Sequence, residues 1–201
     1  MGGRLVAATS VLHRRLVTPP VRRGLSRPIL IPARPKRTSV PGVPGPWPPR
    51  RGKMCGLRAG GKIVRHETEV FAASTGRSER VADITGECAR FAARASGGGD
   101  GLLHVFVPHA TAGLVLMELG ARSDEDLLAV LAGLLPADDR WRHAHGSRGH
   151  GRSHVLPAFL APFLVIPVLG GSLALGTWQS VALVDLNVDN PDRRLRLSFL
   201  G

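Results

Sequence analysis

The stretch FLVIPVLGGSLALGTWQSVALVDL, residues 163–186, decides the expected fold because it holds three short apolar runs with no helical stretch between them. The runs 163–168, 173–175 and 179–186 are rich in Val and Leu, and a Gly-Gly pair between the first two is typical of a tight turn. Strands that follow one another without an intervening helix generally pair antiparallel. This stretch therefore predicts consecutive strands of an antiparallel sheet.

The strand pattern continues on both sides of this stretch. Upstream there are three runs: 62–73, which shows partial alternation with charges on one face, and the apolar runs 102–107 and 111–117; the segment 195–200 repeats the strand pattern at the C-terminus. A Pro-His-Ala break separates the second run from the third. The sheet is therefore expected to contain strands from both halves of the domain.

Two helices are expected beside these strands. One apolar stripe recurs at three- and four-residue steps, as it does on a buried helix face: Val81, Ile84, Cys88, Phe91, Ala92 and Ala95. On this stripe Cys88 is interpreted as a small core residue. The segment Asp124–Leu135 begins with three acids and ends at a proline, which predicts the second helix. The sequence thus predicts an α+β domain, a mostly antiparallel β-sandwich with two helices.

The net charge of +12 is unevenly placed along the chain. Residues 1–66 hold 15 Lys and Arg and no acid, whereas residues 67–201 hold 12 Lys and Arg against 15 Asp and Glu, a net charge of −3. A domain that binds nucleic acid is basic where it is folded. We therefore expect no nucleic-acid partner for the folded part.

Residues 1–53 hold 10 of the 16 prolines and show no apolar periodicity, which predicts a disordered Pro/Arg-rich extension of a domain spanning residues 54–201. Three interpretations stay open: an extension upstream of the true start at Met54, a disordered basic tail, or an organelle transit peptide. The apolar stretch 155–169 is too short to span a bilayer and contains three prolines. We expect no membrane association and a cytoplasmic protein.

Four histidines lie in the segment RHAHGSRGHGRSH, residues 142–154: His143, His145, His150 and His154. Imidazole binds transition metals and moves protons near neutral pH. Metal sites often take two ligands from near neighbours and a third from a distant element, for which His109 at the end of an apolar run is suited. Spacing alone does not separate His143 and His154 from the other two, and a solvated mobile loop is the alternative interpretation.

Three further positions admit both a chemical and a structural role. Glu118 follows a predicted strand, where it can act as a general base, orient a ligand histidine, or lie at the surface. Trp178 either lines a pocket or fills the core. Arg193 and its neighbour Arg194 follow a turn, where they can bind a phosphate or simply flank the turn.

Six motifs follow one another along residues 62–201: His109-Ala110-Thr111-Ala112, Glu118, Trp141-Arg142-His143, Ser153-His154, Gly176-Thr177-Trp178-Gln179 and Arg193-Arg194. In this order they resemble the YjbQ-like proteins, also called the secondary thiamine-phosphate synthase enzyme family. The resemblance implies a small α+β protein built on a β-sandwich, a homotrimer, and a pocket in which three histidines gather.

The resemblance also implies roles for individual residues. The catalytic group would be His109, Glu118, His143 and His154. The metal ligands would be His109, His143 and His154. The substrate-binding residues would be Thr111, Thr177, Trp178, Gln179 and Arg193. The nominal activity is that of a thiamine-phosphate synthase-like transferase acting on a small, phosphorylated substrate.

The chain departs from the family pattern where members carry two asparagines and an aspartate, since it has Met117, Leu119 and Ala121. Three histidines suit a divalent metal such as zinc with an open position, whereas the thiamine-phosphate reaction would use Mg²⁺, which prefers oxygen ligands. Two function classes therefore stand side by side. One is the enzyme, and the other is a metal- or anion-binding module, or a metal-dependent hydrolase, without thiamine-related turnover.

Overall fold

The computed structural model describes residues 57–59 and 62–201, and the disorder predicted for residues 1–53 lies outside them. In chain order the elements are β1 (Leu57–Ala59), β2 (Lys62–Val64), β3 (His66–Ser74), β4 (Arg80–Asp83), α1 (Thr85–Ser96), β5 (Gly101–Phe106), β6 (Ala112–Met117), α2 (Ser123–Leu134), α3 (His150–Ser153), the 3-10 turn η1 (Leu156–Ala158), β7 (Phe163–Leu169), β8 (Ser172–Leu173), β9 (Ser180–Asp185) and β10 (Asp192–Leu200).

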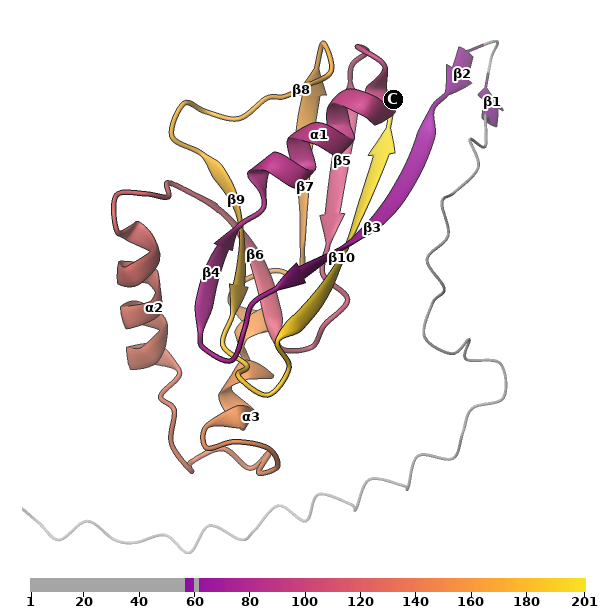
Figure 1. Ribbon diagram of the computed structural model, residues 1–201. Helices are drawn as coiled ribbons and strands as arrows, with labels where there is room; N and C mark the ends of the chain where they lie inside the picture. The colour runs from indigo at the N-terminus through magenta and orange to yellow at the C-terminus, as the bar shows by residue number, and fades with distance from the viewer. Residues whose placement is uncertain (1–56, 60–61) are drawn as a thin grey trace, which may run out of the picture. The chain divides into compact units, whose positions relative to one another are not determined.

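The strands form two main sheets and a small hairpin, and all of their pairings are antiparallel. The larger sheet has the order β3-β10-β5-β7-β8, the second has the order β4-β9-β6, and β1 pairs with β2. Helix α1 lies across one face of the larger sheet, α2 lies beside β4, and α3 lies near the end of β9 (Figure 1). The prediction of an α+β fold with antiparallel sheets is confirmed.

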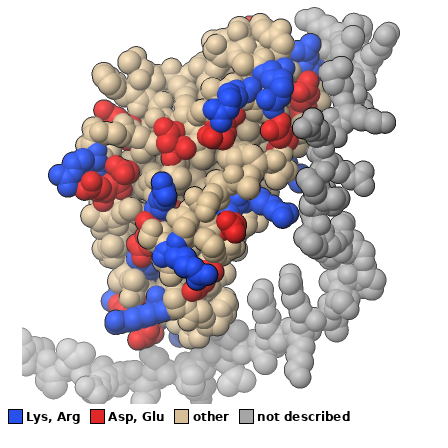
Figure 2. Space-filling model, in the orientation of Figure 1, with Lys and Arg blue, Asp and Glu red and all other residues tan. Residues whose placement is uncertain are grey.

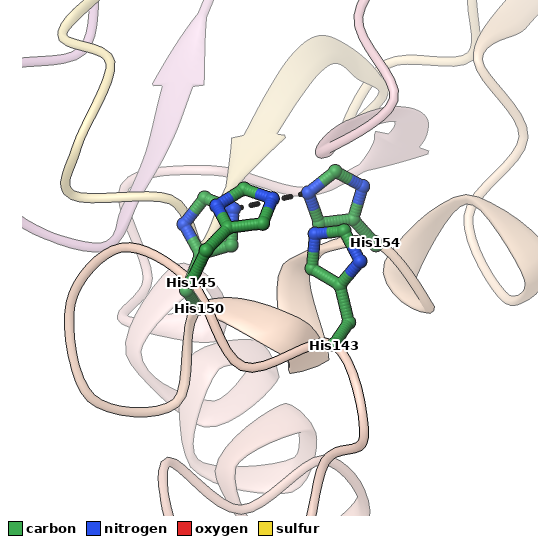
Figure 3. Close-up of side chains that lie close together, drawn as sticks. All are labelled: His143, His145, His150 and His154. Carbon is green, nitrogen blue, oxygen red and sulfur yellow. Dashed lines mark hydrogen bonds between the residues drawn. The ribbon is translucent and has the colours of Figure 1, made fainter. Parts of the chain in front are cut away.

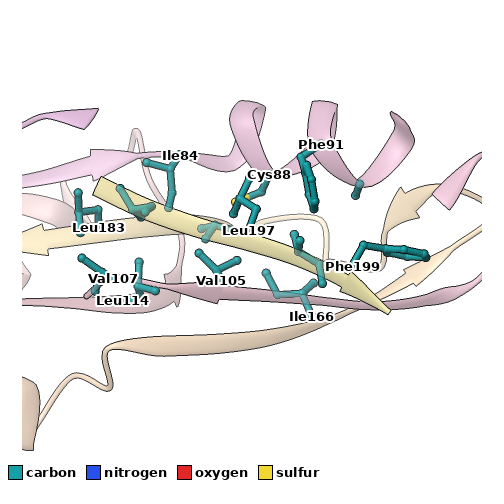
Figure 4. Packing of buried hydrophobic residues seen from close by; sticks show 14 of the residues in the cluster. Ile84, Cys88, Phe91, Val105, Val107, Leu114, Ile166, Leu183, Leu197 and Phe199 are labelled. Atoms are coloured by element: carbon teal, nitrogen blue, oxygen red, sulfur yellow. The ribbon is translucent and has the colours of Figure 1, made fainter. Parts of the chain in front are cut away.

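The main core is formed by α1, the larger sheet and buried residues of β6 and β9, and it follows from alternation along the strands. In β10 the side chains of Leu195, Leu197 and Phe199 are buried, and the residues between them are more exposed. Cys88 and Phe91 of α1 pack against this layer (Figure 4). Burial raises the pKa of the Cys88 thiol to about 12, so this cysteine is an unreactive core residue, as the sequence predicted.

Local structure differs from the sequence expectation at a few places. Val81 was expected on the first helix but lies in β4, where it pairs with Val184 of β9. The segment 142–154, for which a solvated mobile loop was the alternative interpretation, contains the short helix α3 as a third helix. The expected strand 62–73 is divided at Arg65, whose N–H bonds the carbonyl of Gly201. Distant backbone partners decide the differences at Val81 and Arg65, whereas the hydrogen bonds of α3 are local, such as Arg152 N–H to the carbonyl of Gly149.

The register of β6 against β9 fixes where the candidate residues lie. Ala112 pairs with Asp185 at one end, and Met117 pairs with Ser180 at the other. Five residue steps along a strand span about 17 Å. Residues that flank Ala112 and residues that flank Met117 therefore lie at opposite ends of this sheet.

The surface shows no gathering of one charge on the face seen in Figure 2, where Lys and Arg are interspersed with Asp and Glu. Within residues 57–59 and 62–201, no helix combines the length and the apolar character needed to cross a membrane.

Candidate metal centre

Four histidines from one segment of the chain converge at the end of the molecule where α3 lies. Each offers one ring nitrogen, and the four nitrogens all lie within 4.8 Å of one another: His143, His145, His150 and His154 (Figure 3). The Nε2 atoms of His150 and His154 are 3.1 Å apart. An open cleft of about 420 Å³ lies beside the rings and is also lined by Arg148. The cluster therefore combines nitrogen ligands with room for a small molecule.

The spacing of the nitrogens can be compared with the geometry of a zinc site. Two nitrogens bound at about 2.0–2.1 Å at a tetrahedral angle lie about 3.3–3.4 Å apart. The 3.1 Å separation between His150 and His154 is close to that value, and the 4.8 Å limit for the whole group exceeds it. To bind one ion at these bond lengths, the more distant nitrogens would have to move inward.

The backbone beneath the cluster is held by a buried arginine. Arg152 of α3 forms an ion pair with Glu79 and donates from Nη1 to the carbonyl of Leu135 at 2.8 Å. A methyl group at Gly151 would lie 2.6 Å from the carbonyl of His143, so glycine permits α3 to approach the 141–143 segment. The ligand-bearing segment is therefore anchored to both α2 and the turn before β4.

The ring environments favour neutral imidazoles. Desolvation, followed by repulsion from the rings of His145 and His150, lowers the pKa of His143. Desolvation, followed by repulsion from the other three rings, lowers the pKa of His154. Both rings are therefore neutral at pH 7, and a neutral imidazole has a lone pair available for a metal ion.

A carboxylate in the loop between β9 and β10 contacts the cluster from outside. Asp189 Oδ2 lies 2.6 Å from His150 Nδ1 and accepts the backbone N–H of Ser147 at 3.0 Å. These two hydrogen bonds, the backbone N–H first, lower the pKa of Asp189. Asp189 is thus ionised at neutral pH beside the cluster. Nothing in the sequence pattern singled it out.

His109, which was expected to be the third ligand, is not a member of this group of four. Its Nε2 accepts the backbone N–H of Arg194 at 3.0 Å, and its Nδ1 lies 3.4 Å from Arg193 Nη1. Desolvation and then the charge of Arg193 lower the pKa of His109, against the opposing effect of Asp185. The ring is therefore neutral at pH 7, and its Nε2 already accepts a hydrogen bond.

Arg193 itself belongs to a buried polar network. It donates from Nε and Nη2 to the two carboxylate oxygens of Asp185, at 2.6 and 2.7 Å, and both side chains are 1% exposed. Asp185 also accepts the hydroxyl of Thr75 at 2.7 Å. Asn187, in the loop between β9 and β10, donates its side-chain amide to the hydroxyl of Thr111 at 3.4 Å. Arg193 thus supports the fold rather than presenting a free guanidinium to a phosphate.

The remaining candidates lie at the other end of β6 and β9. Glu118 follows Met117 at the end of β6 and is exposed, and Trp178 and Gln179 lie just before the paired Ser180. Trp178 is 72% exposed, so it does not fill the core. Gln179 accepts the N–H of Gly176 through Oε1 at 2.9 Å. Within one chain these residues, with Thr177, are separated from His109 by the length of β6.

A family model supports the resemblance drawn from the motifs. The model for UPF0047 protein YjbQ-like matches residues 69–201, which is well over half of the chain. The chain belongs to the UPF0047 family of YjbQ-like proteins. The match covers all of the candidate residues named above, including the four clustered histidines.

Relatives and solved structures agree with this family assignment. The UPF0047 protein Rv2556c of Mycobacterium tuberculosis is 55% identical over 134 residues, which cover 67% of this chain and 98% of the relative. A UPF0047 protein of Methanothermobacter thermautotrophicus is 32% identical, with 70% and 96% covered. Among structures, a YbjQ-like protein of unknown function from Sulfolobus solfataricus P2 superposes with a TM-score of 0.64 at 28% identity, covering 69% of this chain and 99% of that chain.

A second solved structure, the hypothetical protein APE1520 from Aeropyrum pernix K1, superposes with a TM-score of 0.60 at 34% identity, covering 67% of this chain and 98% of that chain. The relatives named here are thus matched over nearly their whole length. The shared UPF0047 unit corresponds to the antiparallel α+β domain that the structure describes.

Proposed function

We propose that this YjbQ-like protein is a metal-dependent enzyme whose transition metal ion is held by the histidine cluster. The observation that carries the proposal is the convergence of four imidazole nitrogens within 4.8 Å. Nitrogen ligands favour zinc or a similar ion over Mg²⁺, which prefers oxygen. The family resemblance implied His143 and His154 as ligands, and in this proposal His145 and His150 complete the set in place of His109, whose Nε2 accepts the Arg194 N–H.

The proposed substrate is a small phosphorylated molecule, and the nominal reaction is the transfer named for the family, thiamine-phosphate synthesis. The cleft of about 420 Å³ suits a molecule of that size, and Arg148 on its wall is exposed and can pair with a phosphate. A metal ion bound beside this cleft would polarise a bound group or activate water.

A second candidate function is a binding module without turnover. It is favoured by the number of histidines, because four bound imidazoles would fill a tetrahedral site and leave no position for substrate. The departures at Met117, Leu119 and Ala121 favour the same function, since they replace polar groups of the family pattern. If only three of the histidines bind the ion, the fourth position is open to substrate, which favours the enzyme.

Genetic complementation separates the two functions. We expect the full chain to restore growth of a strain that lacks thiamine-phosphate synthase, and the His154→Ala variant to fail, because it lacks one ligand of the cluster. The same strain carrying Arg90→Lys, a change on the exposed side of α1 outside the cluster, is the control. Failure of the wild type, in a protein that still binds zinc, contradicts the enzyme and supports the module.

We propose a homotrimer, because one copy leaves two features without a partner among the described residues. The outer face of the larger sheet exposes apolar side chains: Leu102, Phe163, Val165 and Leu200. Leu102, Val165 and Leu200 border a groove of about 620 Å³. The second feature is Trp178, 72% exposed beside Glu118 at the far end of β6. Neighbouring copies would cover the apolar face and bring that end of β6 to a histidine cluster.

Light scattering on the full chain tests the assembly. We expect a mass three times the 21.4 kDa of one chain at micromolar concentration. The Val165→Lys variant places a charge on the apolar face and is expected to shift the mass toward one chain, because burying an unpaired ammonium group is costly. Arg90→Lys on the exposed side of α1 serves as the control. A wild type that scatters as a single chain contradicts the trimer.

A further inference from the structure

The carboxylate of Asp189 is placed to control one ring of the cluster. Its Oδ2 lies 2.6 Å from His150 Nδ1, and the side chain of His150 is 9% exposed. A carboxylate only accepts hydrogen bonds, so the proton between these atoms belongs to Nδ1. In a neutral imidazole the lone pair then lies on Nε2. That atom faces His154 Nε2 at 3.1 Å, on the inner side of the cluster.

Asp189 is itself held in place from two sides. Its Oδ2 accepts the N–H and the hydroxyl of Ser147, at 3.0 and 3.2 Å, and its own N–H donates to Asn187 Oδ1 at 2.9 Å. Asn187 N–H in turn donates to the buried Asp185 at 2.9 Å. The carboxylate therefore keeps its position relative to both the histidine segment and the rigid end of β9.

The chain at Gly146 is shaped to let the two groups meet. A methyl group there would lie 2.6 Å from both Asp189 Oδ2 and His150 Nδ1, which is closer than atoms of this kind approach. The residue also has a φ of +80°, which favours glycine. Any larger side chain at this position would push the carboxylate and the imidazole apart.

We propose that Asp189 is a positioning residue for the metal site, which fixes the Nδ1–H tautomer of His150 and so aims the Nε2 lone pair at the ion. The proposal rests on the metal function proposed above and adds a residue to it. A carboxylate or carbonyl behind a ligand histidine fixes the ring and raises its basicity, and its loss lowers metal affinity about 10–100-fold. Asp189 acts through His150 and does not touch the ion.

The tautomer can be measured without any metal. We expect ¹⁵N NMR of the ring nitrogens in the metal-free full chain to show His150 protonated at Nδ1. In Asp189→Ala the ring is expected to lose this fixed state, and in Asp189→Asn to keep it, because the amide oxygen can accept the same N–H. A wild-type His150 that is protonated at Nε2 overturns the proposal.

Zinc titration of the same proteins tests the consequence. Asp189→Ala is expected to bind zinc about 10–100-fold more weakly than the wild type. Asp189→Asn is expected to lose less, and Asp189→Ala is expected to have no further effect in a His150→Ala background. An equal loss in that background shows that Asp189 acts elsewhere and overturns the proposal. A wild type that binds no zinc overturns the proposed function, while the tautomer still decides the role of Asp189.

Gly146→Ala is a variant that keeps both groups and only separates them. It is expected to weaken zinc binding in the same way as Asp189→Ala. Gly120→Ala is the matched control, because Gly120 has a similar φ of +89° but a methyl group there meets no atom within 4 Å. Equal zinc affinity in the wild type and Gly146→Ala contradicts the positioning role.

Discussion

Replacing Arg193 with methionine is expected to lower the free energy of unfolding by about 3–5 kcal/mol. The guanidinium and the Asp185 carboxylate form a two-bond pair in which both side chains are 1% exposed. Methionine fills much of the volume but leaves the Asp185 charge buried without its main partner. Hydrogen bonds from Thr75 and the N–H of Asn187 remain, and neither supplies a positive charge.

Urea denaturation of the full chain measures this change. Arg194→Met is the matched control, because Arg194 is the next residue of β10 and its side chain is exposed. We expect the control to change stability by less than about 0.5 kcal/mol. A loss below about 1 kcal/mol in Arg193→Met would show that the pair does not hold the β9 and β10 ends together. In that case the pair would not fix the positions of the segments that hold His109 and Asp189.

Removing a ring of the cluster is expected to have the largest effect on metal binding. His154→Ala deletes one of the four nitrogens that lie within 4.8 Å, and zinc affinity should fall on the order of 100-fold or more. His143→Ala and His150→Ala are expected to behave in the same way. His104→Ala is the control, because His104 lies on the outer face of the larger sheet beside Phe163.

The His109→Ala variant decides between the two ligand sets. The histidine cluster predicts a zinc affinity close to that of the wild type, since His109 contacts Arg193 and the Arg194 N–H instead of the other rings. The ligand set implied by the family resemblance predicts a loss as large as that of His154→Ala. Isothermal titration with zinc on protein purified without an affinity tag measures both. Unchanged affinity in His154→Ala would contradict the cluster as a metal site.

The sequence predicted the elements whose periodicity is long enough to be read locally. The stripe from Cys88 to Ala95 predicted the buried face of α1, and the run 195–200 predicted most of β10. Strand β4 has four residues and exists because β9 pairs with it, so its own composition did not reveal it. The pairing of Val81 with Val184 is a contact between residues far apart in the sequence, so no local pattern predicts it.

The candidate site was predictable in kind and only partly in detail. The four histidines of 142–154 were visible in the sequence, but their spacing could not rank them, because glycines at 146, 149 and 151 let the segment fold back on itself. Asp185 and Asp189 are isolated acids near a turn, without a motif of their own. Their roles depend on the end of β9 lying beside α3, which only the folded chain shows.

A single copy does not bring Glu118 and Trp178 into one pocket with His109, although the family resemblance implies roles for all three at one site. In a single copy, the family-like motif at His109 lies at one end of β6, and those at Glu118 and Trp178 lie at the other end. A common pocket would then have to form between neighbouring copies, which is why the proposed trimer and the proposed enzyme are linked. The zinc site itself requires one copy only, because all four histidines come from one segment.

X-ray absorption spectroscopy of the full chain with one equivalent of zinc shows directly whether the histidine cluster binds a metal ion. We expect one tightly bound ion with nitrogen neighbours at about 2.0–2.1 Å and the outer-shell scattering of three or four imidazole rings. Four rings would indicate the closed binding module, and three rings with one oxygen would indicate the open site of an enzyme. A first shell made mainly of oxygen, or no bound zinc, would contradict the histidine cluster as a metal centre.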